Sequence, residues 1–137
     1  MQRFDQLQVG DPIPALEKAA FIQDQLSCYA HAGADDNPIH VDAEQARAAG
    51  LPGVIAHGML TMGFLGQALT DWVGQRAIRS LSVRFAAIAM LGDTVNCTGV
   101  ISDKREEAGE RRVEVELAAV NQKGERLQTG RAIVALD

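Results

Sequence analysis

Apolar and polar residues alternate along the second half of the chain, and this period of two predicts antiparallel strands. The alternation is clearest at Val113, Val115 and Leu117, which are separated by charged residues. Four strands are expected, within residues 81–85, 94–101, 111–120 and 126–136. The polar stretches 102–111 and 121–125 are expected to join the last three strands as hairpins, the first as a solvated, charged loop.

The first half of the chain has the spacing and end signals of helices. Residues 15–22 are ambiguous between strand and helix and are taken as a first strand. Residues 23–33 combine an apolar face with a terminal glycine, which predicts a helix. A second, short helix is expected within 42–50, with Asp42 as its N-cap and Gly50 as its stop.

The stretch 58–73 is apolar on nearly every side, which is typical of a helix buried all round. It is shorter than the ~20 apolar residues that a membrane span needs, and it contains Gln67 and Asp71. A membrane helix is therefore not expected. A curved antiparallel meander of four strands wrapped around this helix is an α+β architecture, and residues 1–137 fit one domain.

Composition narrows the classes of partner. The net charge of −5 makes nucleic acid an unsuitable partner, because phosphate binding needs a basic face. The first ten residues contain no apolar signal core, so the cytoplasm is the expected location. Cys28 and Cys97 lie far apart without a CxxC motif, and both are expected as small buried residues.

One short turn, "AGADDNPIH" at 32–40, concentrates residues that can carry chemistry. Asn37-Pro38 breaks the helix, so the chain can fold back and bring Asp35 and His40 into one space. An aspartate and a histidine in one pocket can hold a water, remove one proton and deliver another near neutral pH. The structural alternative is an Asx-Pro turn with a capping aspartate, which is common.

A second candidate is Gly58, at the start of the apolar helix. The first N–H groups of a helix lack intrahelical acceptors and can stabilise a carbonyl that gains negative charge. The alternative is that Gly58 is only a tight helix start. His57 is read as a capping or packing residue without chemistry, and His31 as structural or exposed.

The sequence predicts no metal and no cofactor. The spacing of His31, Asp35 and His40 matches no familiar metal site. The chain also lacks a GxSxG motif, a P-loop and a dinucleotide-binding fingerprint.

These motifs closely resemble the MaoC-like, (R)-specific enoyl-thioester hydratases and (3R)-hydroxyacyl dehydratases of the hot-dog fold. Their signature is an aromatic residue, then Asp-x-Asn-Pro-aliphatic-His, and later His-Gly-Met. The matching residues are Tyr29, Asp35, Asn37, Pro38, Ile39 and His40, followed by His57, Gly58 and Met59. Two positions differ: Ala34 stands where the family usually has glycine, and Gly66 where some hydratases carry a supporting serine.

The resemblance implies reversible hydration of trans-2-enoyl thioesters to (3R)-hydroxyacyl thioesters in fatty-acid metabolism. Asp35 and His40 would hold the water, the Gly58 N–H would bind the thioester oxygen, and Asn37 would orient the turn. The substrate would be a thioester of CoA or acyl carrier protein. Gly63 and Gly66 would leave room for the acyl chain.

The resemblance also implies a dimer. Simpler (R)-hydratases are homodimers, whereas "HGMLTMG" and "TDWVG" are most similar to dehydratase subunits that pair with a non-catalytic hot-dog partner. Two other functions stay open: a non-catalytic acyl-thioester-binding or partner subunit, and a hot-dog acyl thioesterase. Acyl length, carrier and direction are not set by these residues.

Overall fold

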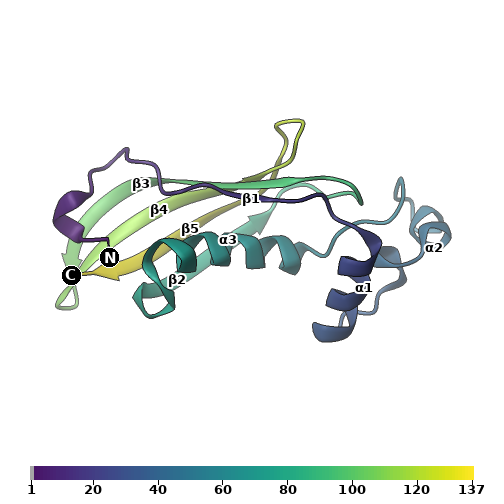
Figure 1. Ribbon diagram of the computed structural model, residues 1–137, viewed down its shortest axis with the longest axis horizontal. Helices are drawn as coiled ribbons and strands as arrows, with labels where there is room; N and C mark the ends of the chain where they lie inside the picture. The colour runs from purple at the N-terminus through teal and green to yellow at the C-terminus, as the bar shows by residue number, and fades with distance from the viewer. Residues whose placement is uncertain (1) are drawn as a thin grey trace.

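The computed structural model describes residues 2–137 as a curved, five-stranded antiparallel sheet with one long helix along its concave side (Figure 1). The strands are β1 (Leu16–Lys18), β2 (Ile78–Phe85), β3 (Val95–Glu107), β4 (Glu110–Val120) and β5 (Arg126–Leu136). Their order in the sheet is β1-β3-β4-β5-β2. The α+β hot-dog architecture predicted from the sequence is confirmed.

The strand order corrects one expectation. Strands β3, β4 and β5 form a meander, but β2 pairs with β5 at the far edge instead of with β3, the next strand in the chain. The predicted meander of four strands is therefore a meander of three. Residues 86–94, here called the crossing segment, carry the chain from β2 across to β3. The first four of them line the cavity of the candidate site.

The expectation of a charged loop at residues 102–111 is also wrong, because this stretch is mostly strand. β3 continues to Glu107, and only Ala108 and Gly109 make the turn, with φ angles of 52° and 76°. The charges pair along this ribbon: Arg105 lies 2.7 Å from Asp103 and 2.9 Å from Glu114. Residues 102–105 are half-buried but all polar or charged, and Glu106 and Glu107 are exposed, so no apolar alternation in the sequence indicates a strand there.

The helices follow their predicted bounds closely. They are α1 (Gln23–Ala32), α2 (Ala43–Ala48) and α3 (Gly58–Val73). The Asp42 side chain caps α2 by accepting hydrogen bonds from the amides of Glu44 and Gln45, as expected. None of the helices in residues 2–137 has the length and apolar character needed to cross a membrane.

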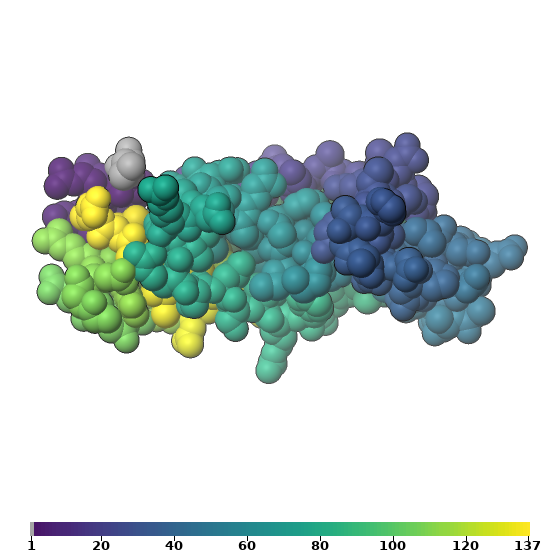
Figure 2. Space-filling model, turned by 90° about the horizontal axis from the view of Figure 1, so that it is seen from below, coloured from purple at the N-terminus to yellow at the C-terminus, as the bar shows by residue number. Residues whose placement is uncertain are grey.

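Helix α3 is buried on one face only, which corrects the expectation of burial all round. Leu65 and Leu69 are fully buried against the sheet, whereas Gly63 and Gln67 are exposed on the opposite face. Figure 2 shows α3, in teal, uncovered on the side of the molecule seen from below. The sheet of a single chain covers only the side of the helix that it curves around.

The two cysteines differ in their surroundings. Cys97 is buried in β3, and burial raises the pKa of its thiol to about 11, so it is an unreactive core residue. Cys28 is exposed on α1, so the expectation that both are buried is wrong for this one. It lies on the solvent side of a helix whose opposite face, at Leu26 and Ala30, packs inward.

Candidate active site

The turn after α1 places Asp35 and His40 through a series of local hydrogen bonds. Ala34 has a φ of 52°, in the left-handed region that favours glycine, and the Asp35 amide then donates to the Ala30 carbonyl at 3.0 Å. The Asn37 side chain accepts from the Ile39 amide at 3.2 Å and so begins the 3₁₀ helix Pro38–His40. This places Asn37 where an orienter of the turn is expected.

Asp35 and His40 come together as the spacing predicted. His40 Nε2 lies 3.7 Å from Asp35 Oδ2, which is longer than a direct hydrogen bond. His40 Nδ1 lies 2.8 Å from the Ile55 carbonyl, and because a carbonyl only accepts, Nδ1 carries the proton. Nε2 is therefore the atom turned toward the carboxylate. The gap suits a small molecule that bonds to both groups.

His57, which the sequence reading left without chemistry, lies directly beside this pair. Its ring stacks on that of His40 at a centroid distance of 3.8 Å and an interplanar angle of 24°. Its Nε2 lies 3.2 Å from the Asp35 carbonyl oxygen. Burial lowers the pKa of His57 below its ordinary value. Its position just before Gly58 in the second motif was the one sequence signal that could have indicated this.

Gly58 is the first residue of α3, as expected, so its N–H group has no intrahelical acceptor. Its carbonyl accepts a hydrogen bond of 2.7 Å from Nε2 of Gln128 on β5, a buried residue that the sequence reading did not single out. The ring of Phe85 lies against Gly58: a Cβ there would be 2.5 Å from Phe85 Cε2. A side chain at residue 58 would therefore force the Phe85 ring to turn aside, toward the solvent that it already faces.

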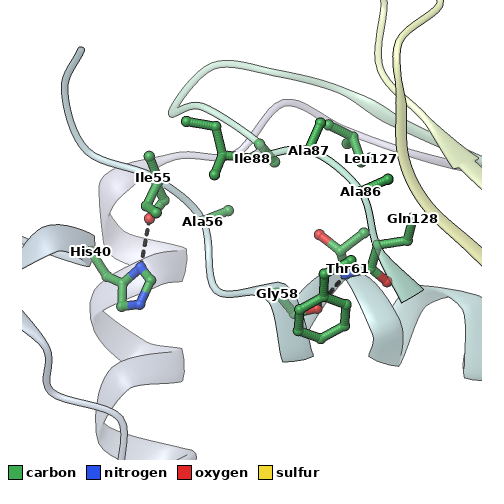
Figure 3. A pocket seen from close by; sticks show the side chains of 12 residues that line it. His40, Ile55, Ala56, Gly58, Thr61, Ala86, Ala87, Ile88, Leu127 and Gln128 are labelled. Carbon is green, nitrogen blue, oxygen red and sulfur yellow. Dashed lines mark hydrogen bonds between the residues drawn. The ribbon is translucent and has the colours of Figure 1, made fainter. Parts of the chain in front are cut away.

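A cavity of about 320 Å³ lies between His40 and Gly58, and Asp35 lies outside its lining, on the other side of His40 Nε2 (Figure 3). His40, Gly58, Thr61 and Gln128 are its polar lining residues, and the rest of the wall is apolar. The apolar wall consists of Ile55, Ala56, Phe85, Ala86, Ala87, Ile88, Ala89 and Leu127. Figure 3 shows Ile55, Ile88 and Leu127 around the space that separates His40 from Gly58.

Gly63 and Gly66 of α3 do not line this cavity, so the expectation that they make room for an acyl chain stays a prediction that the cavity does not support. Gly63 faces open space, and a Cβ on Gly66 would meet only Leu81, at 3.9 Å. Instead, the crossing segment after β2 forms much of the wall, through small residues such as Ala86 and Ala87. No local pattern in residues 86–89 indicates that this segment reaches the start of α3.

A metal ion fits this cluster poorly. The potential ligand atoms of Asp35, His40 and His57 lie within 4.8 Å of one another. However, the lone pair of an imidazole nitrogen lies in the plane of its ring, and the two rings are stacked 3.8 Å apart and nearly parallel. Their lone pairs therefore run side by side and do not converge on one point. The expectation of a metal-free site stays a prediction that this geometry supports.

Comparison with known proteins places the chain in a family. The sequence profile described as "MaoC like domain" matches residues 5–123. An (R)-specific enoyl-CoA hydratase from Rhodospirillum rubrum is 34% identical over 89 residues, which are 61% of this chain and 62% of that protein. The chain belongs to the MaoC-like family.

Solved structures share the whole fold. An (R)-hydratase from A. caviae, involved in PHA biosynthesis, superposes with a TM-score of 0.85 at 25% identity, covering 96% of this chain and 98% of that one. The ChsH1-ChsH2 complex from Mycobacterium tuberculosis gives a TM-score of 0.82 at 21% identity, covering 96% and 100%. In contrast, the chain spans between 8% and 62% of the length of the curated relatives that it matches.

Proposed function

We propose that this chain is a hydro-lyase that interconverts trans-2-enoyl thioesters and (3R)-hydroxyacyl thioesters. The observation that carries the proposal is the 3.7 Å gap between Asp35 Oδ2 and His40 Nε2, together with a cavity that His40 and Gly58, at the start of α3, both line. Asp35 and His40 form an acid–base pair, the Gly58 N–H is an oxyanion donor, and the apolar cavity separates His40 from Gly58. Addition of water to a conjugated thioester needs all three.

In the hydration direction, the pair holds one water and removes a proton from it as its oxygen bonds to C3 of the enoyl thioester. The electrons of the double bond move toward the thioester carbonyl, whose oxygen gains enolate charge. The Gly58 N–H, at the positive end of α3, stabilises that oxygen. The pair then delivers a proton to C2, and dehydration follows the same steps in reverse.

The relatives support this chemistry over a thioesterase or a non-catalytic subunit. The Rhodospirillum rubrum protein is named an (R)-specific enoyl-CoA hydratase, and the A. caviae structure an (R)-hydratase. This chain also keeps both members of the acid–base pair, which a binding subunit would not need. The cytoplasmic location expected from the sequence stays a prediction.

The function is tested by mixing the purified chain with crotonyl-CoA, a longer trans-2-enoyl-CoA and the matching acyl-carrier-protein thioesters. Loss of the conjugated-enoyl absorbance measures hydration. We expect turnover of at least one of these substrates by the wild-type chain. No turnover of any of the four, with the protein folded and dimeric, would contradict the proposal.

The cavity wall predicts where the limit on acyl length lies. Ala87 lines the cavity, whereas Gly66 does not. Ala87→Leu should therefore lower kcat/KM for longer enoyl thioesters relative to crotonyl-CoA, by about tenfold or more, because a single methylene in an apolar pocket is worth that much. Gly66→Leu is the matched control and should leave the ratio unchanged. A change of this ratio in Gly66→Leu but not in Ala87→Leu would show that the acyl chain does not lie in this cavity.

We further propose that the chain forms a dimer in which a second copy continues the sheet along β2. Within residues 2–137, β2 pairs only with β5, so its outer edge of eight residues offers free backbone groups. Phe85, Ile88 and Met59 lie exposed nearby and give this region apolar surface. The ChsH1-ChsH2 complex shows that a chain of this fold also occurs with a different partner.

Sedimentation analysis of the purified chain tests this assembly, and the expected species has twice the mass of the chain. A monomer that hydrates enoyl thioesters would contradict the dimer. If the chain is an inactive monomer that becomes active when a second hot-dog subunit is added, the functional assembly is a heterodimer and not a homodimer.

A further inference from the structure

We propose that His57 is a positioning residue: as a neutral imidazole with its proton on Nε2, it holds the Asp35 main chain and the His40 ring so that both face one water. This inference rests on the proposed function, and it assigns work to a histidine that the reaction steps above do not use. It stands on three separate contacts of one side chain that is 1% exposed.

The first contact fixes which nitrogen carries the proton. His57 Nε2 lies 3.2 Å from the carbonyl oxygen of Asp35. A carbonyl accepts and never donates, so Nε2 bears the hydrogen and Nδ1 the lone pair. Nδ1 is buried and has no hydrogen-bond partner among residues 2–137. A proton on Nδ1 would therefore be a buried donor without an acceptor, which is unfavourable.

The second contact is the stack with His40. The two rings lie 3.8 Å apart, so protonating both would bring two positive charges together in a buried place. His40 can take a proton from water during the reaction only if His57 stays neutral. The third contact is the Tyr29 ring, 4.7 Å away and tilted by 60°, which closes the other side of His57.

The charged or titratable groups that face His57 are thus Asp35 from the turn, His40 from the 3₁₀ helix and Tyr29 from α1. Burial lowers the pKa of His57, the hydrogen bond to the Asp35 carbonyl partly offsets this, and His40 lowers it again. His57 is therefore neutral at pH 7, and lowering the pH through its depressed pKa would place a positive charge directly against the His40 ring. Activity should consequently fall on the acid side as His57 takes up its proton.

His57 also joins this pair to the start of α3, because it is the N-cap residue and Gly58 follows it. Its backbone φ and ψ of −62° and 131° set the direction in which the helix begins. The His57 side chain thus contacts Asp35 and His40, while its backbone begins α3. This explains in physical terms why a histidine with no direct chemistry is buried at this point.

Two substitutions separate the contacts. His57→Phe keeps a flat ring against His40 but removes the donor to Asp35, and His57→Gln keeps an N–H donor but never titrates. We expect His57→Phe to lower kcat by about 10²-fold with little change in KM, because small misplacements of catalytic groups cost about that much. We expect His57→Gln to retain more activity than His57→Phe. Its rate should also fall less steeply at acid pH than the wild-type rate, because glutamine cannot take up the proton that His57 does. His31→Gln, on the exposed side of α1, is the control.

The ring nitrogens of His57 can be observed by ¹⁵N NMR of the wild-type chain, whether or not it is active. At pH 7 we expect a neutral ring with the proton on Nε2. A proton on Nδ1, or a charged ring, would overturn the inference, as would a folded His57→Phe variant with wild-type kcat or an unchanged acid limb in His57→Gln. If wild type hydrates no substrate, the proposed function fails, and the NMR result still decides the tautomer and charge of His57.

Discussion

Replacing Asp35 by asparagine, or His40 by asparagine, is expected to lower kcat for enoyl-thioester hydration by about 10²–10⁴-fold. Asp35→Asn keeps the size of the side chain and removes the charge that polarises the water. His40→Asn keeps an N–H donor for the Ile55 carbonyl and removes Nε2, the atom that faces Asp35 at 3.7 Å. Initial rates at saturating crotonyl-CoA measure both losses.

The controls for this pair come from the same short segment. Asp36 is exposed next to Asp35, and His31 is exposed on α1. Asp36→Asn and His31→Asn should therefore keep kcat close to that of the wild type. A folded Asp35→Asn or His40→Asn variant that turns over substrate at a rate similar to these controls would show that Asp35 and His40 are not the acid–base pair.

Gly58→Pro is expected to lower kcat by about 10²–10³-fold, the usual cost of losing one oxyanion donor. Proline removes the N–H of residue 58 and little else from the helix, since the first helical position tolerates it. The residue before proline must be extended, and His57 already has φ −62° and ψ 131°. The helix should therefore survive while its first N–H is lost.

A second variant separates the lost N–H from the added bulk. Gly58→Ala keeps the N–H but places a Cβ 2.5 Å from the Phe85 ring, so this half-exposed ring must turn aside. The rate ratio of the alanine variant to the proline variant isolates the N–H. A ratio near one would show that the Gly58 amide does not stabilise the reaction.

Much of this architecture could be read from the sequence because local signals agreed with the fold. The bounds of α3 follow from an uninterrupted apolar stretch that begins at Gly58, and the N-cap at Asp42 is visible as a residue type in the right place. The proximity of Asp35 and His40 followed from a helix stop and a proline between them. These are short-range effects that a sequence records directly.

The features that the sequence did not reveal depend on contacts between distant segments. The pairing of β2 with β5, and not with β3, is decided by how the sheet wraps around α3. The cavity wall at Ala86–Ala89 and the bond from Gln128 to Gly58 follow from that pairing, because β5 and the crossing segment meet at the start of α3. The stack of His57 on His40 joins residues that are seventeen positions apart. No periodicity encodes such contacts.

Identifying the product that the wild-type chain makes from crotonyl-CoA decides whether this site hydrates enoyl thioesters. Chiral separation and mass analysis of the thioester, together with a count of free thiol, follow both possible fates of the substrate. We expect an intact thioester that has gained one water and carries a (3R)-hydroxyl group, with no release of thiol. Release of CoA with the double bond intact would identify a thioesterase, and a (3S) product would contradict the proposed (3R) specificity.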